Sequence, residues 1–313
     1  MSRISTINLH MRNVTSLPGS IGILTSLTQL NIGINKLTHL PSTIGNLTSL
    51  STFNAKSNDL SFLPDSIGNL ASLDELDVSN NKLTFLPESI GNLKSVSVLD
   101  VSNNKLTCLP DSIEHMSSLT EFIVSSNSMT HLPDSIGNLL SLSVLNAGNN
   151  HLSSLPDSIG NLAALTWLDI HENQLTCLPD PIGNLLSLSR LNINKNHLTH
   201  LPDSIGNLRS LEHLESNNNQ LTCLSDSIGN LSSLRGLDAG NNLLSYLPVS
   251  IGSLKCLTYL SVSKNRLIDM PDSMNNMSSL RHLHVRDNPI TSTESGINEI
   301  GRKFTIPNVH LHF

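Results

Sequence analysis

The feature that most constrains this chain is an asparagine that returns every 23 residues with no slip in the spacing. Its positions are Asn35, Asn58, Asn81, Asn104, Asn127, Asn150, Asn173, Asn196, Asn219, Asn242, Asn265 and Asn288. A fixed period of this size is typical of solenoid proteins, in which each repeat buries its apolar side only against its neighbours. The spacing therefore predicts one small supersecondary unit, repeated along most of the chain, instead of a compact globule.

The apolar residues before each asparagine predict a short strand. In the repeat at 73–93, Leu76 and Val78 are two residues apart, so both side chains point to one side of an extended chain. Asp77 then points to the other side. Strands of successive repeats would pair in parallel, about 5 Å apart.

The asparagine itself stands where the chain must turn after the strand, and backbone groups there need hydrogen-bond partners. Its side chain carries both a donor amide and an acceptor carbonyl. Asn81 and its equivalents are therefore expected to bridge backbone groups of their own repeat and of the next one. This role is structural and does not involve a ligand.

The second half of each repeat reads Leu-Pro-Asp-Ser-Ile-Gly-Asn-Leu, as at 132–139 and 155–162. Proline suits the first helical position, and Asp or Ser near a helix start can cap free amides. Glycine in the middle disfavours a long helix. The segment therefore predicts a short α or 3-10 turn on the outer, convex side.

The full register, Leu-x-x-Leu-x-Leu-x-x-Asn-x-Leu-x-x-Leu-Pro-x-x-Ile-Gly-x-Leu, resembles a leucine-rich repeat over almost the whole chain. This version is similar to cytosolic proteins that scaffold Ras-type signalling, to their plant Ras-group relatives, and to leucine-rich effectors of intracellular bacteria. The resemblance implies an α/β solenoid of horseshoe shape, with about 13 parallel strands on the concave face and short turns on the convex face. It implies protein binding but selects no partner.

We expect a single domain over residues 1–313. Residues 1–26 form an N-terminal capping repeat, in which Arg12 replaces the asparagine; 27–288 hold twelve regular repeats; and 289–313 form a C-terminal cap. The expected core positions of the first repeat are Ile4, Ile7, Leu9, Val14, Leu17, Pro18 and Ile21. In the C-terminal cap we expect a helix at Glu294–Lys303 and a closing strand within Phe304–Phe313.

The composition argues against several classes of partner. Net charge is −7, and the 18 basic residues are spread thinly, so nucleic acid is not expected as a partner. The chain lacks an apolar run of about 18 residues, so no membrane span is predicted. Hydrophobic content of 38% and aromatic content of 3% would be thin for a globule but suit the single apolar column of a solenoid.

The four cysteines predict a reducing compartment. Cys108, Cys177 and Cys223 share one repeat position, so neighbours among them should lie roughly 15 and 10 Å apart, too far for a disulfide. Neither end of the chain carries the cysteines that cap extracellular members of this class, and the N-terminus does not read as a signal peptide. We therefore expect a cytoplasmic protein, in the host cytoplasm if it is a bacterial effector.

Side chains between the inward strand leucines are free of the repeat pattern and face the concave side. Trp167, the only tryptophan, stands in one such column with Arg190, His213 and Tyr259, residue types that anchor protein interfaces. The predicted partner-binding residues are Trp167, Arg190, His213, Tyr259, Asp169, Glu215 and His171. The alternative is a tryptophan that lies flat on its neighbours with no partner. The acidic column Asp77, Asp100, Asp169, Glu215 and Asp238 either steers a basic segment of the partner or is a solvated face.

Two further clusters stay open at this point. The edge column Phe62, Phe85, Cys108 and His131 either packs over the asparagine turn or forms a binding edge. The pairs His282/His284 and His310/His312 carry common zinc ligands, but no thiol or acid joins them and the sequence does not bring the pairs together. We predict no metal and no cofactor.

These observations favour a non-enzymatic, monomeric interaction module or scaffold that holds a protein partner on its concave face, as a signalling adaptor or secreted effector. One alternative is the substrate-recognition part of a ubiquitin-ligase-type effector. That function needs a catalytic domain with a nucleophilic cysteine, and only 25 residues follow the last repeat. Another alternative is a regulator of a second enzyme, such as a phosphatase or small GTPase, which would use the same surface.

Overall fold

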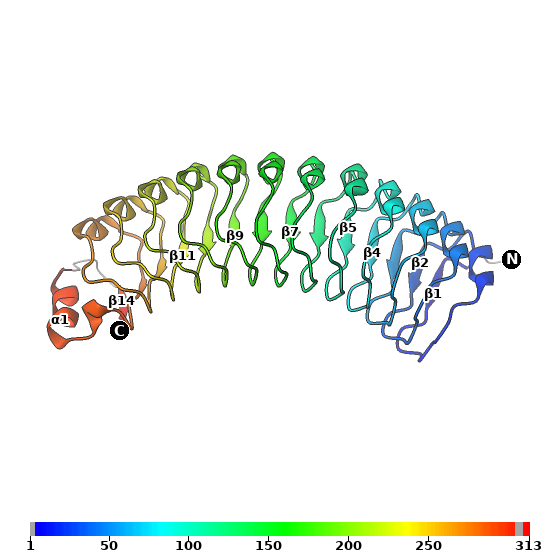
Figure 1. Ribbon diagram of the computed structural model, residues 1–313, viewed down its shortest axis with the longest axis horizontal. Helices are drawn as coiled ribbons and strands as arrows, with labels where there is room; N and C mark the ends of the chain where they lie inside the picture. The colour runs from blue at the N-terminus through cyan, green and yellow to red at the C-terminus, as the bar shows by residue number, and fades with distance from the viewer. Residues whose placement is uncertain (1–3, 304–308) are drawn as a thin grey trace. The chain divides into compact units, whose positions relative to one another are not determined.

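The computed structural model of the protein describes residues 4–303 and 309–313. The chain divides into two compact units, unit 1 (residues 1–152) and unit 2 (residues 153–313). Within each unit short strands alternate with one-turn 3-10 helices (Figure 1). The strands form at the two-residue leucine spacing before each recurring asparagine, and the 3-10 turns form at the Leu-Pro segments after it.

The strands are three residues long, and within each unit they run parallel to their neighbours in chain order. Unit 1 contains β1 (Thr6–Asn8), β2 (Gln29–Asn31), β3 (Thr52–Asn54), β4 (Glu75–Asp77), β5 (Val98–Asp100), β6 (Glu121–Ile123) and β7 (Val144–Asn146). Unit 2 contains β8 (Trp167–Asp169), β9 (Arg190–Asn192), β10 (His213–Glu215), β11 (Gly236–Asp238), β12 (Tyr259–Ser261), β13 (His282–His284) and β14 (His310–His312). Equivalent residues pair, as Leu76 does with Leu99 and Leu191 with Leu214.

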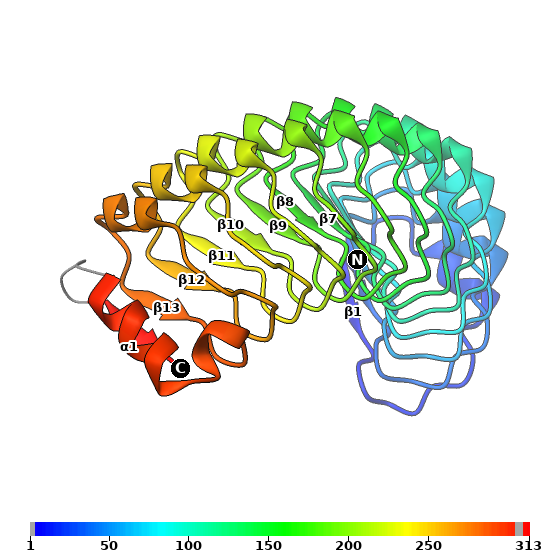
Figure 2. The ribbon, with the colours of Figure 1, turned by 60° about the vertical axis from the view of Figure 1, so that its left-hand side comes forward.

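The turns are 3-10 helices. Unit 1 holds η1 (Gly19–Ile23), η2 (Ser42–Asn46), η3 (Asp65–Asn69), η4 (Glu88–Asn92), η5 (Asp111–His115) and η6 (Asp134–Asn138). Unit 2 holds η7 (Asp157–Asn161), η8 (Asp180–Asn184), η9 (Asp203–Asn207), η10 (Asp226–Asn230), η11 (Val249–Ser253), η12 (Asp272–Asn276) and η13 (Pro289–Thr291). Figure 2 shows them on the side of unit 2 away from β9 to β13. The predicted α/β solenoid of parallel strands and short turns is confirmed, and β1 to β13 occupy the thirteen predicted strand positions in the described residues.

The capping chemistry of these turns differs from the prediction. Proline stands one residue earlier than expected: Pro87 is the residue before η4, with an extended ψ of 149°, and no side chain caps the turn. In η10, where Ser225 replaces proline, the serine hydroxyl accepts the Ser227 N–H at 3.2 Å. The turns stay short partly because repeats approach closely. A Cβ on Gly45 would lie 2.2 Å from the Ser66 carbonyl oxygen.

The recurring asparagine forms the hydrogen bonds that hold each turn. Asn81 Nδ2 donates to the Val78 and Ser79 carbonyls of its own repeat, at 3.0 and 3.1 Å, and to the Ala55 carbonyl at 3.1 Å. Its Oδ1 accepts the Leu60 N–H at 3.0 Å. Ala55 and Leu60 belong to the preceding repeat, so the predicted bridge to the next repeat is wrong in direction. The turn directs the asparagine backwards, and the asparagine of the following repeat makes the forward link.

The two ends are partly covered. In the first repeat Leu17 and Ile21 are buried as predicted, but Ile4 is 51% exposed and Pro18 is also exposed, so their assignment to the core is wrong. They lie at the end of unit 1, where only one described repeat packs against them. At the other end α1 (Glu294–Lys303) follows η13, and its Ile300 is 1% exposed, as predicted. Of the predicted closing strand, β14 is present, and residues 304–308 lie outside the described residues.

Candidate functional site

The strands β8 to β13 of unit 2 bury their middle residue and turn their first and third residues to the opposite side. In β8, Leu168 is 0% exposed while Trp167 is 39% exposed. We call the outward side of the strands the strand face. We call the predicted binding residues on or next to it the Trp167 patch: Trp167, Asp169, His171, Arg190, His213, Glu215 and Tyr259.

The parallel register arranges the first residues of the strands in one row. Across β8 to β12 this row reads Trp167, Arg190, His213, Gly236 and Tyr259. Four strand spacings separate Trp167 from Tyr259, which gives a row about 19 Å long. Trp167, Arg190 and His213 are therefore immediate neighbours, and Tyr259 stands apart behind a glycine.

Gly236 has a specific effect on this row. A Cβ at this position would lie 2.8 Å from His213 Nδ1, so the imidazole occupies the space that a side chain would fill. His213 is half-buried there, whereas Tyr259 is 37% exposed. The row thus has a low, polar centre between two aromatic residues.

The third residues of the strands carry the acidic side chains, and they are unequally accessible. Asp169 is only 7% exposed, and its Oδ1 accepts both the His171 N–H at 3.2 Å and His171 Nδ1 at 2.7 Å. Glu215 is exposed and accepts a hydrogen bond from Asn194 Nδ2 at 2.9 Å. Asp169 therefore orients His171, while Glu215 offers its charge to solvent.

The acidic column in unit 1 also forms hydrogen bonds with its own backbone. Asp100 Oδ1 accepts the Ser102 N–H at 2.9 Å and the Ser102 hydroxyl at 2.6 Å. Burial raises the pKa of Asp100 despite these bonds, which act in the opposite direction. Asp77 makes the same pair of bonds with Ser79. Sequence alone indicated the outward direction of these carboxylates, not this intramolecular role.

Comparison with known proteins identifies the family. A family model described as a leucine-rich repeat region matches residues 76–151 and 145–223. A solved leucine-rich repeat protein of Leptospira interrogans is 30% identical, with 96% of this chain and 82% of that chain covered and a TM-score of 0.81. This chain belongs to the leucine-rich repeat family. No curated protein sequence matches it.

Two other solved leucine-rich repeat proteins are similar. An internalin of Listeria monocytogenes is 23% identical over 99% of this chain and 86% of its own, with a TM-score of 0.82, and shows the shared fold. The plant peptide hormone receptor RGFR1, solved in complex with RGF2, is 28% identical over 88% of this chain and 49% of its own, with a TM-score of 0.73. The chain thus spans about half of that receptor. The finer likeness to Ras-type scaffolds stays a prediction.

The histidine pairs, which the sequence left apart, lie together at the end of unit 2. His282 pairs with His310 and His284 with His312, and the rings stack with centroids 5.4 and 4.0 Å apart. Among the described residues no three His, Cys, Asp or Glu side chains are arranged to hold a metal ion. Burial, and then the charges of His312 and His282, lower the pKa of His284.

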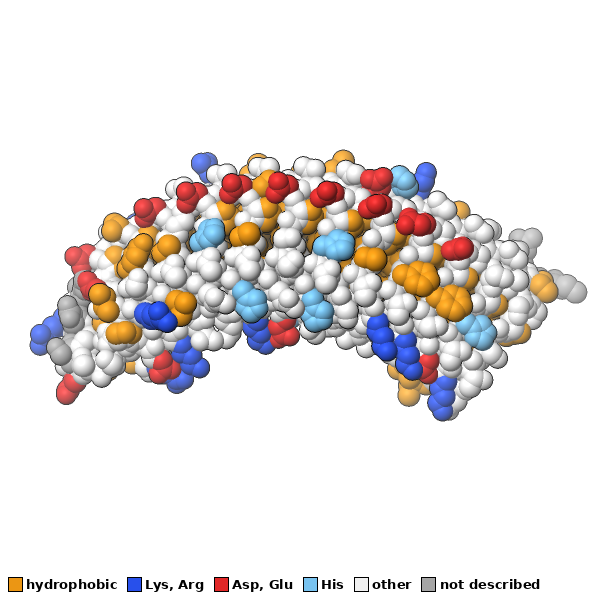
Figure 3. Space-filling view, in the orientation of Figure 1, with side chains coloured by type: hydrophobic (Ala, Val, Ile, Leu, Met, Phe, Trp, Pro, Cys, Tyr) orange, Lys and Arg blue, Asp and Glu red, His pale blue; other side chains and the backbone are white. Residues whose placement is uncertain are grey.

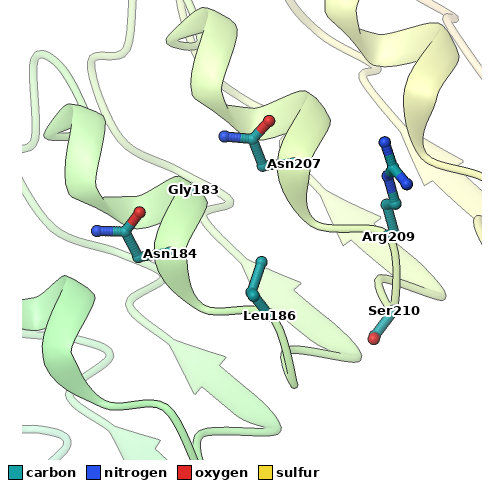
Figure 4. A pocket seen from close by; sticks show the side chains of 6 residues that line it. All are labelled: Gly183, Asn184, Leu186, Asn207, Arg209 and Ser210. Carbon is teal, nitrogen blue, oxygen red and sulfur yellow. The ribbon is translucent and has the colours of Figure 1, made fainter.

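An open depression of about 760 Å³ lies on the 3-10 side of unit 2 (Figure 4). It is lined by Gly183, Asn184, Leu186, Asn207, Arg209 and Ser210. These residues include no carboxylate, imidazole or thiol, so the depression offers no acid–base pair. The four cysteines of the leucine-rich repeats are all free. In residues 4–303 and 309–313, no helix has the length and apolar character needed to cross a bilayer.

The two perturbed histidines give a pH prediction. The hydrogen bond that His171 donates to Asp169 raises the pKa of His171, although burial opposes the shift, whereas the pKa of His284 is lowered. The stability contributed by His171 is present below its unfolded pKa of about 6.5 and is lost as pH rises through its folded pKa. That contributed by His284 is present above the unfolded pKa and is lost as pH falls through the folded pKa.

Proton NMR titration of the imidazoles measures both shifts. We expect His171 to titrate above and His284 below about 6.5. Replacing Asp169 with asparagine should bring the pKa of His171 back down, because the charged acceptor is removed, while leaving His284 unchanged. If His171 titrates at the unfolded value in the parent chain, its pairing with Asp169 does not hold in solution.

Proposed function

We propose that this leucine-rich repeat chain is a non-enzymatic interaction module that holds a protein partner on the strand face of unit 2. The observation that carries the proposal is the exposure of Trp167 beside Arg190 on adjacent, rigidly paired strands. Tryptophan and arginine are enriched among the residues that dominate binding energy at protein interfaces. The repeat pattern requires neither residue at these positions.

Rigidity of the strand face supports this function. Leu168 and Leu191, which lie between the outward residues of β8 and β9, are 0% and 1% exposed. Asn196 ties the same two repeats through bonds to the Ile170 and Ile193 carbonyls at 3.0 and 3.2 Å. A surface held in this way is formed before the partner arrives, so little ordering entropy is lost on binding.

Charge on the strand face favours a partner with a basic segment. Glu215 is exposed at the edge of the Trp167 patch, and Asp238 pairs with it in register on β11. Complementary charge of this kind raises the association rate and suppresses wrong partners. RGFR1, whose structure contains RGF2, is an example of a similar protein with a bound peptide hormone. Signalling-adaptor and effector roles would both use this surface.

Free cysteines support a reducing compartment, which we propose to be the cytoplasm. We propose that the two units act as one monomeric domain, with residues 1–26 and 289–313 as its caps. Sedimentation of the purified chain as a monomer, together with a melt that does not change on adding reductant, is the expected result. A concentration-dependent dimer would contradict the monomer.

Site-specific crosslinking tests the proposal. A photoreactive residue placed at Arg190 should capture a discrete protein from a cell lysate. The same residue at Asn207, which is exposed on the 3-10 side (Figure 4), is the matched control. A partner seen from position 190 and not from position 207 is the expected result. The same set of proteins from both positions would contradict a strand-face site.

A further inference from the structure

Unit 1 carries a second surface, away from the strand face, where the chain passes from the asparagine turn into the 3-10 turn. An open groove of about 750 Å³ lies there. Its lining includes Phe85, Cys108 and His131 and the carboxylates of Asp65, Glu88 and Asp111. We call it the proline-edge groove because prolines form part of its floor. In Figure 3 apolar side chains lie beside a row of acidic ones over this part of unit 1.

The aromatic residues at this edge do not pack away. Phe62 is 43% exposed and Phe85 52% exposed. The two occupy the same position in successive repeats, so one strand spacing of about 5 Å separates them. They therefore form a continuous apolar strip. If the two side chains only packed over the asparagine turn, about half of their surface would not remain exposed.

The repeat does not require aromatic residues at this position. Its other occupants are Ser16, His39, Cys108, His131, Ser154, Cys177, His200, Cys223, Tyr246 and Asp269. Only in unit 1 do two aromatic residues follow each other here. Adjacent exposed phenylalanines are costly in water and are typical of a surface that meets another molecule.

In the part of the chain that the structure describes, the carboxylates along the groove have no lysine or arginine as an ion-pair partner. Asp65, Glu88 and Asp111 each begin a 3-10 turn and are exposed. Among residues 4–303 and 309–313 no lysine or arginine forms an ion pair with any of them. Lys82 pairs elsewhere in unit 1, with Asp59 at 2.7 Å.

Acidic residues at the same position continue into unit 2, at Asp157, Asp180 and Asp203, because a negative charge suits the start of a helical turn. The acidic row alone is therefore a property of the repeat. Only in unit 1 does this row run beside two exposed phenylalanines: Phe85 lines the groove, and Phe62 lies one repeat before it, next to the groove. This combination makes the groove and its Phe62 end a specific surface.

We propose that the proline-edge groove binds an extended protein segment in which basic and apolar side chains alternate. In an extended chain alternate side chains point to opposite sides, so one set faces the phenylalanine strip and the other the carboxylate row. The negative charge of the groove excludes phosphate-rich partners. A second copy of this chain, with its own net charge of −7, lacks the complementary charge.

Fluorescence anisotropy with defined peptides tests this proposal on the full chain. The probe is a labelled peptide of alternating lysine and leucine, about six residues long, since six extended residues reach about 20 Å. Peptides of alternating lysine and serine, and of glutamate and leucine, are the controls. We expect binding of the lysine–leucine peptide that weakens with salt, and much weaker binding of both controls.

Variants of the chain show where the lysine–leucine peptide binds. Replacing Phe62 and Phe85 together with serine should weaken binding about tenfold or more, because the apolar strip is lost. The matched control is Tyr246→Ser, which removes an exposed aromatic residue at the same repeat position in unit 2 and should change nothing. The double variant Glu88→Gln, Asp111→Asn should reduce the salt dependence of peptide binding. All these side chains are exposed, so the melting temperature should stay unchanged.

Four outcomes of the peptide-binding experiments would overturn the proposal. They are no binding of the lysine–leucine peptide, equal binding of either control peptide, equal loss in the Tyr246→Ser variant, and loss in a Trp167→Ala variant with none in the phenylalanine variant. The last result would place the peptide on the strand face. Dimerisation that the phenylalanine variant abolishes would assign the groove to a second copy and would equally contradict us.

Discussion

Replacing Asn127 with alanine is expected to lower the free energy of unfolding by about 3–5 kcal/mol, because it leaves several buried backbone groups without partners. Asn127 Nδ2 donates to the carbonyls of Val101, Val124 and Ser125 at 3.1, 3.1 and 3.2 Å. Its Oδ1 accepts the Leu106 N–H at 2.9 Å. Alanine offers none of these bonds. The preceding residue has a left-handed φ of 55°, a strained conformation that these bonds help to hold.

Chemical denaturation followed by circular dichroism measures this loss. The matched control is Asn92→Ala, which removes an exposed asparagine at the end of η4 and should cost less than about 0.5 kcal/mol. Hydrogen exchange should show the greatest loss of protection in the repeats on either side of Asn127, because each repeat depends on its neighbours. Similar losses in the two variants would contradict the structural role of the recurring asparagine.

Replacing Trp167 with alanine is expected to weaken partner binding by about 2 kcal/mol or more, close to a 30-fold rise in Kd, and to leave stability nearly unchanged. Trp167 is partly exposed and has no place in the apolar column. The neighbouring variant Leu168→Ala should behave in the opposite way. It removes a fully buried side chain and should cost about 2–5 kcal/mol of stability.

A thermal melt and an affinity titration against the crosslinked partner separate the two effects. Arg190→Ala and Tyr259→Ala should follow Trp167→Ala, with the smaller effect at Tyr259 because Gly236 separates it from the other two. Unchanged affinity in all three variants would move the partner off the Trp167 patch.

Much of the fold could be predicted from sequence because its determinants are local and repeated. The two-residue spacing of Leu76 and Val78 indicates which side of the strand is buried, and the 23-residue period indicates how strands pair. Both signals recur in almost every repeat, so a single irregular residue such as Ser225 does not change the predicted fold. The burial of residues at the ends was harder to predict. Ile4 matches the core pattern but is exposed, because no described repeat packs on one side of it.

The site could be predicted only in outline. Alternation correctly placed Trp167 on the exposed side of β8. It could not show that Asp169 is largely buried and hydrogen-bonded to His171, or that His213 lies over Gly236, because these depend on side-chain conformation. The meeting of the histidine pairs also escaped prediction, since β14 follows α1 and has no place in the 23-residue period.

The most direct test uses Trp167 as its own reporter. It is the only tryptophan in the chain, so incorporating a fluorinated tryptophan gives one fluorine NMR signal. Adding the unlabelled partner should shift this signal and remove its response to a soluble paramagnetic quencher, because the exposed indole becomes covered. A partner that saturates the chain while the signal and its quenching stay unchanged would contradict binding at the Trp167 patch.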